Sequence, residues 1–115
     1  MNLLPNYEDA VIPIEKFTQY ALNDDSDPDK AIAFRNALGY TPDNVNWLIA
    51  NIRRNLPCFE STPKGDNGFG MRYECIMSLT GSNGRSANVV TGWIVENGTD
   101  FPRLTTAYVT DKNPR

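Results

Sequence analysis

The hydrophobic pattern of this chain changes its period near residue 60. Before that point, apolar residues recur every three or four positions, which is the spacing of one face of an α-helix. After that point, apolar and polar residues alternate, which is the period of a β-strand with one buried face. Helices followed by strands are typical of α+β proteins, whose helices pack on one face of an antiparallel sheet. The chain of 115 residues is long enough for one such domain.

The first half of the chain predicts three N-terminal helices. The first ends before the acidic turn at residues 23–29, because Asn, Asp, Ser and Pro favour turns. The second begins after Asp27, an N-cap residue, and stops at Gly39, which adopts the left-handed conformation easily. The third begins after Thr41 and ends before Pro57. The apolar stripes of these helices are expected to face the core, since a short chain needs every apolar face it has.

The second half predicts an antiparallel meander of three or four strands. The alternating segments run over residues 71–79, 86–95 and 103–109, and residues 57–62 are a candidate edge strand before them. A hairpin is expected at Asn83-Gly84, because this pair accepts the positive φ angles of a tight turn. The predicted architecture is therefore three helices packed on one face of a three- to four-stranded sheet, whose other face is free to carry function.

Polar residues gather on the predicted sheet. Strict alternation in the last strand places Leu104, Thr106 and Tyr108 on one face and the residues between them on the other. Thr91 and Trp93 also share a face of their strand. For each residue alone, the alternative is that Thr and Tyr are simply good strand formers and that Trp93 fills the core.

One domain is expected over residues 1–111, with a flexible tail at residues 112–115. No stretch approaches the roughly 18 apolar residues of a membrane span. The N-terminal residues do not resemble a signal peptide, which favours a cytoplasmic protein. Cys58 and Cys75 do not have the spacing of a metal or redox motif, so we expect buried or half-buried free thiols.

The chain contains no histidine. Histidine is the usual general acid or base near neutral pH and the commonest metal ligand, so its absence excludes triads that depend on it. Two cysteines alone cannot complete a zinc site. The aspartates at residues 24–29 are interpreted as caps and solvating charge, with an oxygen-ligated cation site as the weaker alternative. We therefore expect neither a metal nor a cofactor.

Charge is unevenly distributed along the chain, whose net charge is -3. Residues 1–63 carry five basic and nine acidic side chains, whereas residues 64–115 carry six basic and five acidic ones. The arginines of the second half are therefore the least neutralised cations. They are candidates for contact with a polyanion, and the alternative is ordinary solvated surface charge.

Four blocks of the sequence resemble a family of small, uncharacterised bacterial domains. These blocks are LPNYEDAVIPIEKFTQYAL, DKAIAFRNALGYTPDN, GFGMRYECIMSLTGSNGRSANVVTGWIV and DFPRLTTAYV. Such domains stand alone or form the C-terminal module of long polymorphic toxins. Their order of helices and meander is similar to the fold of barnase, EndoU, colicin E5 and RelE-type ribonucleases, which is an analogy of fold and does not by itself fix function.

The resemblance implies metal-independent RNA cleavage as one function. Arg85 and Arg103 would hold the phosphate, Lys30 would add charge or act as base, Thr106 would orient a phosphate oxygen, and Tyr108 would act as acid. RNA would be the partner because this reaction needs the 2′-hydroxyl. The segment DDSDPDK departs from the family pattern, which often has His-Pro and a Gly just before the lysine.

The second function considered is a non-catalytic interaction module, similar to an immunity protein or an antitoxin. It would bind a cognate protein encoded nearby, through the free sheet face or the acidic helical half. The acidic balance and the missing histidine favour this alternative. Transfer of ADP-ribose or other nucleotide chemistry is a third, weaker alternative, because the sequence carries no motif for it.

Overall fold

The structure is a computed structural model that describes residues 2–115. Its helical elements are η1 (Tyr7–Asp9), η2 (Phe17–Ala21), α1 (Pro28–Leu38), η3 (Pro42–Asn44), α2 (Val45–Asn55) and η4 (Leu56–Cys58). Its strands are β1 (Ser61–Asp66), β2 (Gly70–Thr80), β3 (Ser86–Glu96) and β4 (Arg103–Thr110). The strands form one antiparallel sheet in the order β1-β2-β3-β4. The prediction of an α+β fold with an antiparallel meander is confirmed.

The first helical element differs from the predicted α-helix. It is η2, a five-residue π-helical turn, so residues 2–115 form two α-helices and not three. The amide of Leu22 donates to the carbonyl of Phe17 at 2.8 Å, which is the spacing of the wider π turn. This turn buries Phe17, Ala21 and Leu22 together.

Asp27 and Gly39 cap α1 as predicted, whereas Thr41 caps η3, the 3-10 turn that leads into α2 at Val45. The Asp27 carboxylate accepts the amide of Lys30 at 3.3 Å, and Gly39 ends α1 with φ +74°. The Thr41 hydroxyl accepts the amide of Asp43 at 3.3 Å, and the Thr41 amide donates to the Asn44 side chain at 2.8 Å. Each α-helix has 11 residues. Across residues 2–115, we find no helix with the length and apolar character needed to span a membrane.

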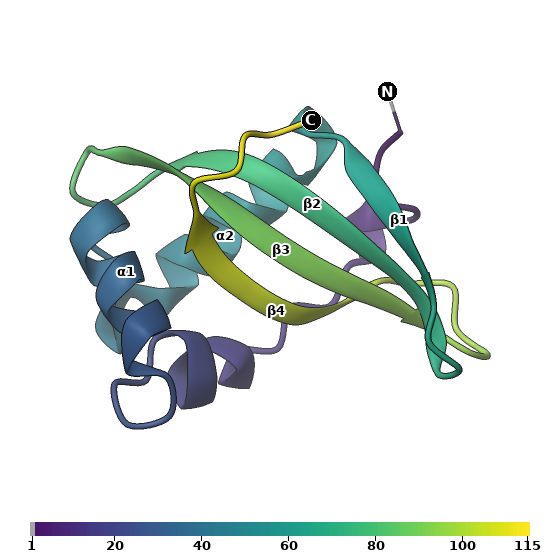
Figure 1. Ribbon diagram of the computed structural model, residues 1–115, viewed down its shortest axis with the longest axis horizontal. Coiled ribbons are helices and arrows are strands. Elements are labelled where there is room, and N and C mark those ends of the chain that lie inside the picture. The colour runs from purple at the N-terminus through teal and green to yellow at the C-terminus, as the bar shows by residue number, and fades with distance from the viewer. Residues whose placement is uncertain (1) are drawn as a thin grey trace.

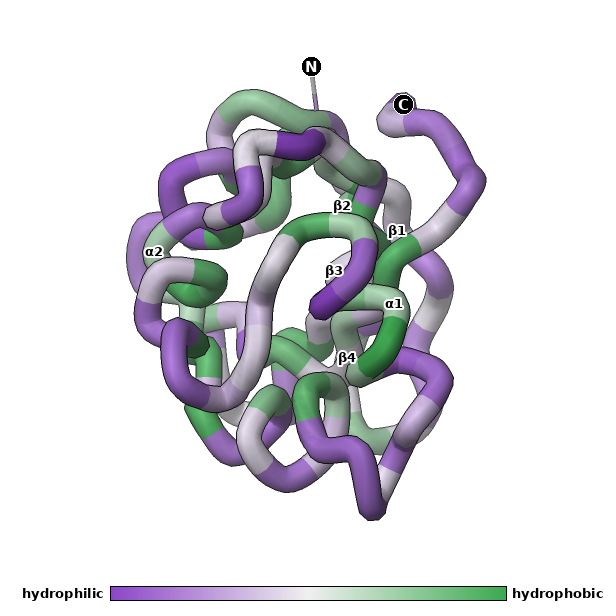
Figure 2. The backbone as a smooth tube through the Cα atoms, turned by 90° about the vertical axis from the view of Figure 1, so that its left-hand side faces the viewer, coloured by the Kyte–Doolittle hydropathy of each residue, from purple (hydrophilic) through white to green (hydrophobic). Residues whose placement is uncertain are grey.

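The core lies between the helices and one face of the sheet. Figure 1 shows α2 behind the sheet and α1 at the left, beside the ends of the strands. α1 contacts β4 and β3, and α2 contacts β2. Figure 2 shows hydrophilic colour along the C-terminal tail. The fully buried side chains include Phe17, Phe34, Leu38, Leu48, Ile52, Met77, Leu79, Val89, Trp93 and Leu104.

A β-bulge in β4 overturns the alternation predicted for that strand. Leu104 lies opposite Trp93 and Thr106 lies opposite Gly92, so Thr105 is an extra residue. Leu104 and Ala107 consequently face the core, three positions apart, and both are buried. Thr106, Tyr108 and Thr110 therefore face the other side of the sheet. The prediction that Leu104 shares a face with Thr106 was wrong because it assumed an unbroken period of two.

The fourth predicted strand forms, at a different position. β1 begins at Ser61 and not at residue 57, because Leu56–Cys58 continues α2 as a 3-10 turn. The strand then extends to Asp66, four residues beyond the predicted end at residue 62. The β2–β3 hairpin forms at the predicted place, with Gly84 at φ +79°.

The two ends of the chain both pack against the sheet. Val11 forms a parallel bridge with Arg103, and its amide donates to the carbonyl of Pro102 at 2.8 Å. This bridge covers the beginning of the outer edge of β4. At the other end, the Asn88 side chain donates to the carbonyl of Lys112 at 3.0 Å. The hydrophilic tail crosses β3 on the near side of the sheet in Figure 1.

The two cysteines lie in different environments. Cys75 is buried in β2, whereas Cys58 is exposed in η4 and not half-buried as predicted. Burial raises the pKa of the Cys75 thiol above its ordinary value, and the neighbouring Ser61 and Thr91 hydroxyls oppose this effect. Cys75 is therefore held as the neutral thiol in the folded state.

The stability of the fold is expected to fall at alkaline pH because of Cys75. The unfolded chain loses this proton near pH 8.5, whereas the folded chain retains it to higher pH. The protonated Cys75 thiol therefore contributes fully to the free energy of unfolding below about pH 8.5. Above that pH the contribution is lost by at most about 1.4 kcal/mol per pH unit. Between pH 7.5 and 10, the free energy of unfolding measured by urea denaturation should fall less steeply for Cys75→Ala than for the wild type. Cys58→Ala is the control, and parallel curves for Cys75→Ala and the wild type would contradict the expectation.

Candidate functional site

A hollow of about 230 Å³ opens on the sheet face opposite the core. Val90 and Gly92 of β3 form its floor. Its polar walls come from three strands, and we call the hollow the sheet groove. The polar side chains of the sheet groove are Lys64, Arg72, Glu74, Thr105, Thr106 and Tyr108.

Lys30 brings α1 into contact with this face of the sheet. Its ammonium donates to the Thr106 hydroxyl at 3.4 Å and lies 5.5 Å from the ring centroid of Tyr108. The ammonium is also 3.6 Å from the Asp27 carboxylate. The first turn of α1 is set by the Asp27 cap and by Pro28, which places Lys30 beside β4. The side chain of Lys30 is 36% exposed, so it is an ion-paired cation at the rim of the groove.

The bulge and Gly92 together present two hydroxyl groups. A Cβ atom at Gly92 would lie 2.8 Å from the Thr106 methyl and 3.2 Å from the Thr105 hydroxyl. Only a glycine leaves room for both threonine side chains above β3. Adjacent hydroxyls on one strand can donate to two oxygens of the same anion.

Arg72 is fixed on the β1 side of the groove. Its guanidinium donates to the carbonyl of Lys64 at 3.1 Å and to the carbonyl of Gly65 at 3.4 Å. Lys30, Lys64 and Arg72 thus stand around a groove whose own carboxylate is Glu74. In a chain with a net charge of -3, this is a local excess of positive charge that favours an anionic ligand.

A second hollow, of about 200 Å³, lies at the open edge of β4. We call it the edge pocket. It shares Thr105 and Thr106 with the sheet groove, and Lys30 lines it next to this shared wall. Its full lining is Lys16, Tyr20, Ala21, Ser26, Asp27, Lys30, Thr105, Thr106 and Ala107.

The structure brings together three of the five residues that the sequence proposed for the site. Lys30, Thr106 and Tyr108 meet at the sheet groove. Arg103 lies on the same strand opposite Ile94, but the linings of the groove and the edge pocket, taken over residues 2–115, do not include it.

Arg85 lies at the other end of the sheet. It precedes β3, and Gly92 in the floor of the groove is seven positions further along the chain. At about 3.3 Å per residue this separation is roughly 20 Å. The structure therefore does not bring Arg85 to the groove with Lys30.

Sequence reasoning missed Lys64, Glu74 and Tyr20 as members of this region. Glu74 shares a face with Arg72 in the predicted strand, so the alternation places both on the same side of the sheet, although Glu74 was not chosen as a site residue. Lys64 lies outside the strands predicted from the sequence, because the predicted edge strand ends at residue 62 and β1 extends to Asp66. Tyr20 carried no signal of its own, since an aromatic residue in a helical pattern is most often part of the core.

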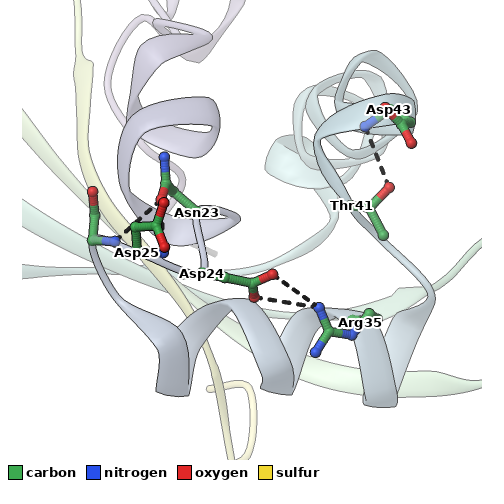
Figure 3. A network of polar contacts seen from close by, with 7 residues as sticks. Asn23, Asp24, Asp25, Arg35, Thr41 and Asp43 are labelled. Carbon is green, nitrogen blue, oxygen red and sulfur yellow. Dashed lines mark hydrogen bonds and ion pairs between the residues drawn. The ribbon is translucent and has the colours of Figure 1, made fainter.

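The acidic turn before α1 is held by its own side chains, as Figure 3 shows. The side-chain oxygen of Asn23 accepts a hydrogen bond from the backbone amide of Asp25 at 2.9 Å. The Asp24 carboxylate pairs with the Arg35 guanidinium at 3.3 Å. With the Asp27 cap, these contacts agree with the interpretation of the aspartates as caps and surface charge. Across residues 2–115, we find no group of three or more Cys, Asp or Glu side chains placed to hold a metal ion.

Comparison with known proteins places nearly the whole chain in one family. A family model described as "Domain of unknown function (DUF6883)" matches residues 3–111. The chain has no match among curated proteins. It has no match among solved structures either.

Proposed function

The chain belongs to the family of domains of unknown function DUF6883, and from that starting point we propose that it is a metal-independent ribonuclease. One observation carries the proposal. The Lys30 ammonium, from α1, meets the Thr106 hydroxyl and the Tyr108 ring at a groove on the sheet. The resemblance to toxin modules and the analogy to a ribonuclease fold support the same function. In this proposal the groove holds the phosphate at which the chain is cut.

The charges and donors of the groove suit a phosphodiester. Lys30, Lys64 and Arg72 supply positive charge, and Thr105 and Thr106 supply hydroxyl donors. These groups would stabilise the additional negative charge that the phosphorus centre carries in the transition state. Lys30 takes this role because it is an ion-paired, partly exposed cation.

The reaction is an attack of the 2′-oxygen on the adjacent phosphorus. The O2′–P bond forms and the P–O5′ bond breaks, which leaves a 2′,3′-cyclic phosphate and a 5′-hydroxyl. Glu74 is the carboxylate in the groove, and we assign it the proton of the 2′-hydroxyl. Tyr108 donates a proton to the departing O5′. Arg103, on the same strand, would contact a neighbouring phosphate of the RNA.

Replacing Lys30 is expected to abolish most of the cleavage. A 5′-labelled RNA is incubated with purified protein and a chelator, and the 2′,3′-cyclic phosphate product is quantified. Lys30→Ala should reduce the rate about 100-fold or more, because it removes a cation from the transition state. Arg85→Ala is the matched control and should leave the rate unchanged, since Arg85 lies outside the groove. Intact RNA with the wild type, or equal rates for the two variants, would refute the proposal.

A second candidate function is the non-catalytic interaction module. The observation that favours it is Trp47, whose side chain is 75% exposed on α2. Exposed tryptophans are enriched at protein interfaces. The cleavage assay distinguishes the two functions, because an interaction module of this type leaves RNA intact in both the wild type and Lys30→Ala.

A further inference from the structure

We infer that the edge pocket is a subsite for one unpaired nucleobase, so that the substrate is single-stranded RNA. This inference rests on the proposed function, because it takes the sheet groove as the phosphate site. Thr105, Thr106 and the neighbouring Lys30 separate the two hollows. A nucleotide whose phosphate is held at this wall has its base within reach of the edge pocket.

The edge pocket offers an aromatic ring for stacking. Tyr20 lines it, and the side chain of Tyr20 is 55% exposed rather than part of the core. The Lys16 ammonium lies 5.7 Å from the ring centroid of Tyr20. The backbone at Tyr20 is fixed, since the amide of Asn23 donates to its carbonyl at 3.0 Å. Stacking on aromatic side chains is the usual way in which proteins hold the bases of single-stranded RNA.

Polar groups at the same pocket can contact the edge of a base. Ser26 and Asp27 line it beside Tyr20. The Asp27 carboxylate caps α1 and pairs with Lys30, and a carboxylate has further lone pairs for an N–H donor. Such acceptors favour a base with N–H groups on its Watson–Crick edge. That edge is available only when the base is unpaired.

The size of the edge pocket also fits one base. Its volume of about 200 Å³ is below the range of about 300–1,000 Å³ that is typical of pockets enclosing a whole small molecule. A planar ring stacked on Tyr20 needs less space than a complete nucleotide. The sugar and phosphate would lie outside, over the shared wall of threonines.

The test measures binding of uncleavable RNA by fluorescence anisotropy. The probes are a labelled 2′-O-methyl pentanucleotide, the same strand paired with its complement, and the same strand with abasic sites. The single strand is expected to bind more tightly than the duplex. Tyr20→Ala should weaken binding of the single strand about tenfold and leave the abasic strand unchanged, whereas Tyr20→Phe should retain wild-type affinity.

Two controls separate this inference from the proposed function. Phe69→Ala removes an aromatic side chain that is 76% exposed outside both hollows, and it should not change binding. Lys30→Ala should weaken binding of the intact and the abasic strands alike. If Lys30→Ala weakens binding and Tyr20→Ala does not, the base subsite is refuted and the phosphate site remains. If Lys30→Ala changes neither affinity, the phosphate site beside Lys30 is refuted, and with it the placement of the cleavage site in the groove.

Discussion

Replacing Trp93 with alanine is expected to lower the free energy of unfolding by about 4 kcal/mol, the middle of the range for a buried aromatic residue. Trp93 is 1% exposed and lies on the core face of β3. Its indole N–H donates to the Thr91 hydroxyl at 2.9 Å, and that hydroxyl donates to the carbonyl of Cys75 at 2.7 Å. The substitution therefore leaves a large cavity and removes the partner of a buried hydroxyl.

The other tryptophan of the chain provides the matched control. Trp47 is 75% exposed, so Trp47→Ala should change the free energy of unfolding by at most about 0.5 kcal/mol. Trp93→Phe retains most of the ring volume and removes the indole N–H, and it should cost about 1–2 kcal/mol. Urea denaturation followed by circular dichroism measures all three variants. Similar decreases in the free energy of unfolding for Trp93→Ala and Trp47→Ala would contradict the buried position of Trp93.

The second large effect is expected at the hairpin between β2 and β3. Gly81 lies directly against the end of α1, where an added Cβ would be 2.1 Å from the carbonyl oxygen of Leu38 and 2.5 Å from its Cα. Backbone atoms cannot move aside as a flexible side chain can. Gly81→Ala should therefore lower the free energy of unfolding by about 3 kcal/mol, the upper part of the range for overpacking.

A glycine three positions later separates steric from conformational cost. A Cβ at Gly84 would meet open space, but its φ of +79° is unfavourable for other residues. Gly84→Ala should cost about 1 kcal/mol, from backbone conformation alone. The order of the two losses, measured by urea denaturation, is the test. A loss at Gly84 that equals or exceeds the loss at Gly81 would contradict the close approach of hairpin and helix.

The sequence predicted the features of the fold that depend on local chemistry. The caps at Asp27 and Thr41 and the stop at Gly39 follow from side-chain hydrogen bonding and from backbone freedom, and all three are present. The alternation in β2 and β3 also predicted their core faces, because both strands pair without interruption. Local patterns therefore sufficed for the class of fold and for most of the buried residues.

The features that the sequence did not predict depend on tertiary packing. The π turn over Phe17–Ala21 replaces the regular α-helix predicted there. The late start of β1 follows from the 3-10 turn that continues α2. Neither feature leaves a distinct periodic signal, since each breaks the regular spacing from which elements are predicted.

The sequence predicted only part of the candidate site, because the site also depends on contacts between distant parts of the chain. Lys30, Thr106 and Tyr108 meet although Lys30 is 76 residues from Thr106 in the chain. The resemblance to a family had grouped them, whereas spacing alone could not. The same resemblance grouped Arg85 with them, but β3 is long enough to place Arg85 at the opposite end of the sheet from the groove.

The single extra residue in β4 acts as a phase shift within the strand. Ahead of Thr105 the strand buries an even-numbered residue, Leu104, and beyond it the strand buries an odd-numbered one, Ala107. If β4 kept Thr105 and Leu104 in place but paired without the bulge, the rest of the strand would turn over, with Ala107 outward and Thr106 and Tyr108 in the core. The chemistry of this face thus depends on the bulge, which absorbs one residue of β4 and keeps Thr106 and Tyr108 facing outward.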